Sequence, residues 1–81
     1  MRVVLLYFAS LKERAATPQD ALELPEGATL RDAVERAGQL HPSLLPLGPS
    51  VRCAKNAELS SLDAALADGD EVALLPPVSG G

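Results

Sequence analysis

Residues 3–8 read VVLLYF, and this apolar stretch is the strongest indication of the fold. β-branched and aromatic residues stand among the six and no charge interrupts them, which is typical of a strand buried on both faces. Such a strand belongs at the centre of its sheet. Because side chains alternate along a strand, one face carries Val3, Leu5 and Tyr7, and the other carries Val4, Leu6 and Phe8.

A second apolar strand is predicted over residues 71–75, EVALL. It follows the tight-turn sequence DGD at 68–70 and stops at Pro76, because a proline cannot donate a ladder hydrogen bond. Weaker strand patterns lie over residues 21–24 and 51–55. Together these segments predict a sheet of four or five strands.

The main helix is predicted to begin after Thr29, which caps it, with Asp32 at the third helical position, where an acid suits the helix dipole. The sequence His41-Pro42 ends it. Apolar residues recur on one stripe at helical spacing, namely Leu30, Ala33, Val34, Ala37 and Leu40.

The remaining segments are predicted to be short. Residues 10–16 form a helical turn, with Ser10 as N-cap and Glu13 at the capping-box spacing. Residues 60–66 are irregular or a further helical turn. The other connections are turns and loops over residues 17–20, 25–27, 42–50 and 56–58.

The element order is therefore β-β-α-β-β. The two most apolar strands are expected to lie side by side at the centre, with the first two strands antiparallel and the main helix across one face. This is an α+β roll of the ubiquitin type. The second sheet face is left with apolar residues that no predicted helix covers, and such a patch usually marks a partner site. We expect one domain over residues 1–75 and an extended tail over 76–81.

Composition restricts the kind of partner. The chain has 81 residues, a net charge of −4 and scattered basic residues, which argues against nucleic-acid binding and favours a basic surface on a protein partner. The single cysteine, Cys53, allows no intrachain disulfide and fits a reducing cytoplasm. The run at 3–9 is too short for a membrane span and does not resemble a signal peptide.

No side chain is arranged for catalysis. The one histidine, His41, fits the C-terminal end of a helix, where cations are favoured. Cys53 fits a small core residue, and the acids at 68–71 fit a charged turn rather than a metal site. There is no glycine-rich phosphate loop. The main chain, and its free end in particular, is therefore the place to look for chemistry.

The sequence ends in PPVSGG: Pro76, Pro77, Val78, Ser79, Gly80 and Gly81. Taken alone, two glycines fit a frayed end. Here two prolines hold the first part extended, and residues without Cβ then make the chain as narrow as it can be. This is the shape needed to thread an α-carboxylate, that of Gly81, into the active site of another enzyme.

The chain resembles the small subunit of molybdopterin synthase. The matching stretches are VVLLYFASLKE, LPEGATLRDAVE, AKNAELS and, most specifically, LADGDEVALLPPVSGG. The resemblance implies a β-grasp fold and a sulfur carrier that is not an enzyme alone. It implies that an activating enzyme, related to those of ubiquitin, adenylates Gly81 with ATP, and that sulfur from a donor protein then gives a thiocarboxylate.

The same resemblance implies that the tail enters the large synthase subunit, in a heterotetramer, and that its sulfur converts cyclic pyranopterin monophosphate into the dithiolene of molybdopterin. It places Phe8, Leu59 and Leu75 at hydrophobic partner contacts, although Phe8 and Leu75 also fit a core. Lys55 departs from the family pattern, and an exposed sheet edge would accept it. The tail equally fits a sulfur carrier for thiazole, cysteine or tRNA thiolation, or a ubiquitin-like protein modifier.

Overall fold

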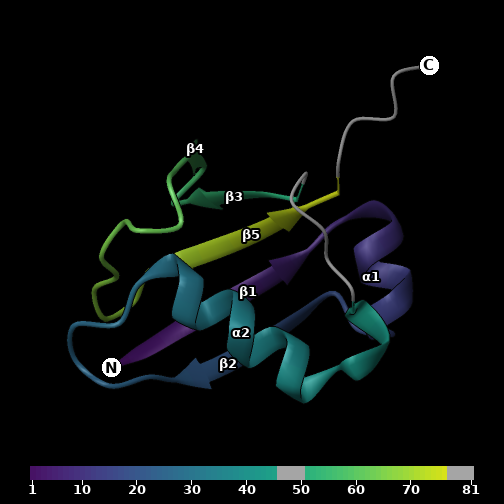
Figure 1. Ribbon diagram of the computed structural model, residues 1–81, viewed down its shortest axis with the longest axis horizontal. Coiled ribbons are helices and arrows are strands. Elements are labelled where there is room, and N and C mark those ends of the chain that lie inside the picture. Colours follow the sequence, from purple (N-terminus) through teal and green to yellow (C-terminus); the bar gives the residue numbers. More distant parts are fainter. Residues whose placement is uncertain (46–50, 77–81) are drawn as a thin grey trace.

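The computed structural model describes residues 1–45 and 51–76 (Figure 1). Five strands form one mixed sheet in the order β2-β1-β5-β3-β4, and two α-helices lie on it, so the predicted α+β architecture is confirmed. The elements are β1 Arg2–Tyr7, α1 Ala9–Ala15, β2 Gln19–Glu23, α2 Leu30–Leu40, the 3-10 helix η1 Pro42–Leu44, β3 Arg52–Lys55, β4 Glu58–Leu59 and β5 Glu71–Leu75.

The centre of the sheet is the predicted one. Strands β1 and β5 are adjacent and parallel, with Leu5 opposite Val72 and Tyr7 opposite Leu74. Strand β2 pairs antiparallel with β1, also as predicted. A parallel pair needs a long crossover, and here the whole chain between the two strands provides it.

The helices cover one face of this sheet, with the longer helix α2 running across it (Figure 1). Beneath them Val3, Leu5 and Tyr7 of β1 are buried, as are Val72 and Leu74 of β5, so β1 divides into the two faces that its alternation predicts. Most of the predicted stripe of α2 also points inward. Its last member, Leu40, does not: it is 44% exposed at the end of the helix.

The start of α2 is the predicted one. Thr29 is the N-cap, and its backbone N–H donates to the Asp32 carboxylate at 2.9 Å. That carboxylate also accepts from the Thr29 hydroxyl at 3.3 Å. One acid therefore satisfies a free donor of the first turn and suits the positive end of the helix dipole.

Several predicted boundaries are wrong. Helix α1 begins at Ala9 with Phe8 as its N-cap, so Ser10 lies inside the helix and forms no capping box with Glu13. The predicted turn over 17–20 is wrong in its second half, because β2 begins at Gln19, which pairs with Leu6 of β1. Pairing with the central strand outweighs the turn preference of these residues.

The second half of the chain also differs in detail. The proline-rich loop begins with the 3-10 helix η1, and the predicted turn over 56–58 ends in the short strand β4, which makes β4 rather than β3 the sheet edge. The predictions for residues 46–50 and 77–81 lie outside the described residues. None of the helices described is long and apolar enough to cross a membrane.

Candidate functional site

The face of the sheet opposite the helices, here called the open face, carries an apolar band. Its central members are Val4 and Leu6 of β1 and Ala73 and Leu75 of β5, each of them half-buried. They alternate with the fully buried residues of the same strands, so the band is the predicted uncovered face. No helix of the described chain lies over it (Figure 1).

Two large apolar side chains at the ends of this band are exposed. Phe8 follows the last residue of β1 and is 44% exposed, while Leu59 of β4 is 64% exposed. Leu59 lies opposite Ala54 of β3, which in turn lies opposite Ala73 of β5. Phe8 and Leu59 therefore lie on the surface rather than in the core. Leu75 is half-buried on the open face.

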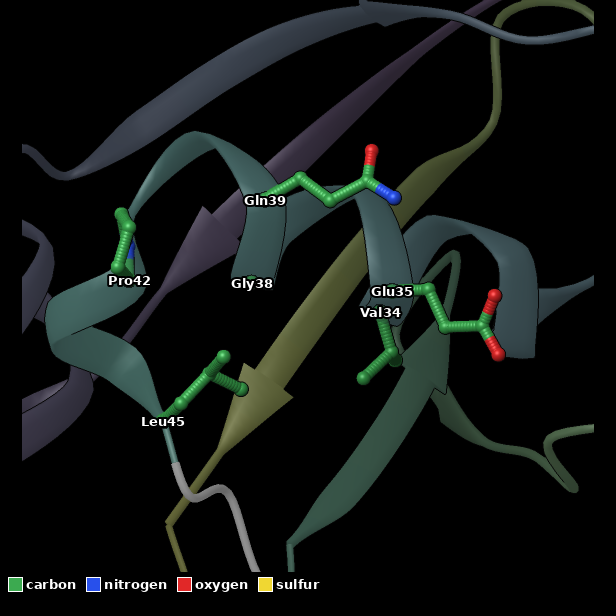
Figure 2. Close-up of a pocket in the computed structure, with 6 residues that line it drawn as sticks. All are labelled: Val34, Glu35, Gly38, Gln39, Pro42 and Leu45. Atoms are coloured by element: carbon green, nitrogen blue, oxygen red, sulfur yellow. The ribbon is translucent and has the colours of Figure 1, made fainter.

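The described surface has two hollows, one beside the open face and one on the helix side. The smaller, about 240 Å³, is lined by Val51, Arg52, Cys53, Leu59, Ser60 and Leu62 and so adjoins the open face. The larger, about 510 Å³, lies on the helix side between α2 and η1 and is lined by the residues drawn in Figure 2. A Cβ at Gly38 would approach the Leu45 side chain to 3.0 Å, so glycine allows the chain after η1 to pack closely on α2.

The predicted tail begins where β5 ends. Leu75 is the last strand residue and Pro76, also half-buried, follows it outside the sheet, as expected of a proline. The other predicted tail residues, Pro77 to Gly81, lie outside the described residues.

The histidine does more than end a helix. His41 is the C-cap of α2, and its Nε2 lies 2.6 Å from the carboxylate of Asp20 on β2. The Tyr7 hydroxyl donates to the same oxygen at 2.8 Å, and the Tyr7 and His41 rings meet edge to face. Burial, and then the hydrogen bond to Asp20, raise the pKa of Tyr7 far above 10. The cluster of Tyr7, Asp20 and His41 connects the end of α2 to the sheet. No sequence motif predicted it.

The structural role of Arg14 was also not predicted from the sequence. Its guanidinium, on α1, donates to the backbone carbonyls of Ser43 and Leu44, and the Ser43 hydroxyl donates back to the Arg14 carbonyl. These bonds fix η1 against α1. The role of Arg14 is therefore to hold the helix layer together.

The acidic turn before β5 is structural, as predicted. Asp68 accepts from the Arg2 backbone N–H at 2.7 Å, and Asp70 accepts from the Ala67 N–H at 2.8 Å and from the Asn56 amide at 3.0 Å. The bonds from Asn56 and Ala67 lower the pKa of Asp70. The carboxylates thus order the turn that starts the central strand β5.

Cys53 and Lys55 occupy the covered side of β3. Cys53 is buried, which raises the pKa of its thiol and keeps it in the protonated, unreactive form, as expected of a core residue. Lys55 is not at an exposed edge, because β3 lies between β5 and β4. Its Nζ donates to the Ala65 carbonyl at 3.1 Å, which accounts for a lysine at this position.

This sheet order, with one long helix across one face, defines a ubiquitin-like β-grasp domain. The model of the ThiS family matches residues 5–81. The chain therefore belongs to the ThiS family of ubiquitin-like sulfur carriers.

The relatives of this chain fall into two groups of proteins with different names. It is 37% identical to the molybdopterin synthase sulfur carrier subunit of Chlamydomonas reinhardtii, with both chains covered in full. It is 35% identical to small archaeal modifier protein 1 of Haloferax volcanii, over 91% of this chain and 94% of that protein.

Solved structures agree with this division. A crystal structure of the Haloferax volcanii modifier superposes on the chain with a TM-score of 0.92 at 31% identity, covering all of both chains. A Helicobacter pylori structure, described as a complex of subunits 1 and 2 of molybdopterin-converting factor, contains a chain that superposes with a TM-score of 0.70 at 26% identity, again over all of both chains.

Proposed function

We propose that this chain is the sulfur carrier subunit of molybdopterin synthase and that the α-carboxylate of Gly81 carries the sulfur. The observation that carries the proposal is the position of the tail. The central strand β5 ends at Leu75 beside an uncovered apolar face, and Pro76 follows immediately. A partner that binds the open face is thereby brought next to the root of residues 76–81.

The chemistry needs only the main chain of this protein. The Gly81 carboxylate attacks the α-phosphorus of ATP on an activating enzyme, and pyrophosphate leaves. A hydrosulfide-equivalent sulfur from a donor protein then attacks the acyl carbon, and AMP leaves. The thiocarboxylate that remains has a sulfur more nucleophilic than a carboxylate oxygen, which suits it to donate to cyclic pyranopterin monophosphate in the large subunit.

The partner is proposed to bind the open face mainly through hydrophobic contacts. Phe8 and Leu59 are exposed and Leu75 half-buried, so a partner would bury apolar area that the free domain leaves in water. The Helicobacter pylori complex of two subunits supports such an assembly for a similar chain. The tail residues Pro76 to Gly80 would then thread into the partner, and the assembly would be a heterotetramer.

A second function has support of its own, because the similarity to small archaeal modifier protein 1 is as close. A modifier would use the same adenylated Gly81 but pass it to an amine of a target protein. A sulfur carrier for another thiolation pathway would also use it.

Reconstitution separates these functions. The thiocarboxylated chain is mixed with the cognate large synthase subunit and cyclic pyranopterin monophosphate, and dithiolene formation is followed by mass spectrometry. Stoichiometric loss of sulfur from Gly81 with formation of product supports the synthase function. Sulfur retained on the chain contradicts it, and isopeptide-linked conjugates in the activating mixture would instead support a modifier.

A further inference from the structure

Acidic and basic side chains are unevenly distributed between the two ends of the sheet. The end at which the tail leaves β5, here called the exit end, holds the last residues of β1 and β5 and the first of β3, because Tyr7 lies opposite Leu74 and Arg52 opposite Leu75. The far end holds the turn before β5 and the start of α2 (Figure 1). Of the eleven acidic side chains, those at the far end are Glu23, Glu26, Asp32, Glu58, Asp63, Asp68, Asp70 and Glu71.

The exit end is different, because basic side chains outnumber acidic ones there. Its acids are Glu13 and Asp20, and Asp20 is already bound to Tyr7 and His41, while the eleventh acid, Glu35, lies midway along α2. Its basic residues are Lys12 and Arg14 on α1 and Arg52 on β3, and Arg14 is bound to carbonyls of η1. A domain with a net charge of −4 therefore presents a basic end where β5 stops.

Lys12 and Arg52 are the exposed cations at this end that no acid neutralises. Every Asp and Glu of the chain lies within the described residues, and none of them is in salt-bridge contact with either side chain. The other described ion pairs involve Arg2, Arg31 and His41. Both charges are thus available to a partner.

Arg52 borders the apolar open face, and Lys12 follows the exposed Phe8 by one helical turn. Residues directly opposite each other in a sheet share a face, so Arg52 stands beside Leu75, and it lines the hollow that Leu59 also lines. Lys12 lies one helical turn after Phe8, whose carbonyl its backbone N–H approaches at 3.4 Å. Apolar contact and positive charge therefore occur together around the root of the tail.

We propose that Lys12 and Arg52, here called the basic collar, dock against an acidic rim on the partner protein, around the opening that receives residues 76–81. The proposal rests on the proposed function, in which a partner takes up the tail. Opposite charges at such a rim speed the correct encounter, and the acidic far end is repelled from the same rim. The net charge alone predicts a basic partner, whereas the local charge predicts an acidic one at the tail.

The length of the tail separates this role from contact with the reacting atoms. Six residues follow Leu75, and an extended chain spans at most about 3.3–3.6 Å per residue, so Gly81 can lie roughly 20 Å away. With the tail extended into the large subunit, Arg52 would meet the rim of the opening rather than the reacting sulfur on Gly81. Arg52 is thus a specificity-determining residue for docking, with no part in the chemical step.

The test is the association rate of the full chain with the cognate large synthase subunit, measured by stopped flow without ATP, at low and high salt. We expect Arg52→Glu and Lys12→Glu each to slow association about tenfold at low salt. We expect the difference to fall below about twofold near 0.5 M salt, where screening is nearly complete. Lys12 and Arg52 lie on different elements, so one variant remains if the other fails to fold.

Arg31→Glu is the matched control, because it changes the net charge equally but lies at the far end, paired with the exposed Asp63. We expect it to slow association less than either collar variant at low salt, and by less than about twofold near 0.15 M salt, where the Debye length is about 8 Å and charge at the far end is screened from the rim. Equal slowing by Arg31→Glu and Arg52→Glu, or rates that no reversal changes, would overturn the basic collar. Failure of the unmutated chain to bind would instead contradict the proposed function and remove the partner.

Discussion

Leu5 and Leu6 are neighbours in β1 and point to opposite faces of the same sheet. Leu5 lies beneath the helices with none of its surface exposed, whereas Leu6 lies half-buried on the open face. The same contrast runs along β5, where Val72 and Leu74 are buried and Ala73 and Leu75 are not. Apolar sequence alone therefore does not define a core: the helix layer turns one face into the core and leaves the other for a partner.

The largest expected effect is on the covered face. Leu5→Ala should lower the free energy of unfolding by about 2–5 kcal/mol, because it removes buried methyl groups and leaves a cavity. Leu6→Ala, the same change one residue later, should cost about 1 kcal/mol or less, since less apolar area is lost. Urea unfolding followed by circular dichroism measures both. Equal losses would show that the two faces do not differ in the way described.

The next effect is on binding rather than stability. Phe8→Ala and Leu59→Ala should each weaken binding of the large synthase subunit at least tenfold, about 1.4 kcal/mol, with little change in unfolding. Leu40→Ala is the control, because Leu40 is as exposed as Phe8 at 44% but lies at the end of α2. Isothermal titration calorimetry gives the three affinities. If Leu40→Ala weakened binding to the same degree, the open face would not be the surface that binds the large subunit.

A smaller effect is expected from the cluster that joins the two layers. The pKa of Tyr7 is raised in the folded state by burial and by Asp20, so the fold favours the protonated hydroxyl. Its contribution to stability is complete below pH 10 and decreases as the pH rises above that value. Tyr7→Phe should cost about 1 kcal/mol at neutral pH, where its hydrogen bond is lost.

The same variant should also flatten the alkaline decline in stability. Urea midpoints between about pH 9 and 11 compare the two proteins on this point, because the ionising hydroxyl is absent from the variant. Parallel declines of the two proteins would mean that Tyr7 does not couple folding to pH.

The parts of the fold that were predictable depend on nearby residues. The buried runs at 3–8 and 71–75 predicted the central strands, and Thr29 with Asp32 predicted the start of α2. The start of β2 and the short strand β4 were not predictable in this way, since they depend on pairing with distant strands. The Asp20 cluster joins three elements, and no local pattern places Asp20 near His41.

The candidate site divides in the same manner. Alternation along β1 predicted which residues share a face and that one sheet face stays uncovered, and the structure carries Phe8 and Leu59 on the surface. The basic collar was not evident from the sequence, because Lys12 and Arg52 are 40 positions apart: Arg52 reaches the exit end through its pairing with Leu75, and Lys12 because α1 follows the end of β1. The role of Gly81 stays a prediction.

The most direct measurement is the intact mass of the full chain after incubation with its activating enzyme, ATP and a sulfur donor. We expect the gain that corresponds to one oxygen replaced by sulfur, and no gain on a chain that lacks Gly81 but unfolds at the same urea concentration. An unchanged mass for the full chain, or the same gain without Gly81, would contradict the proposed role of Gly81.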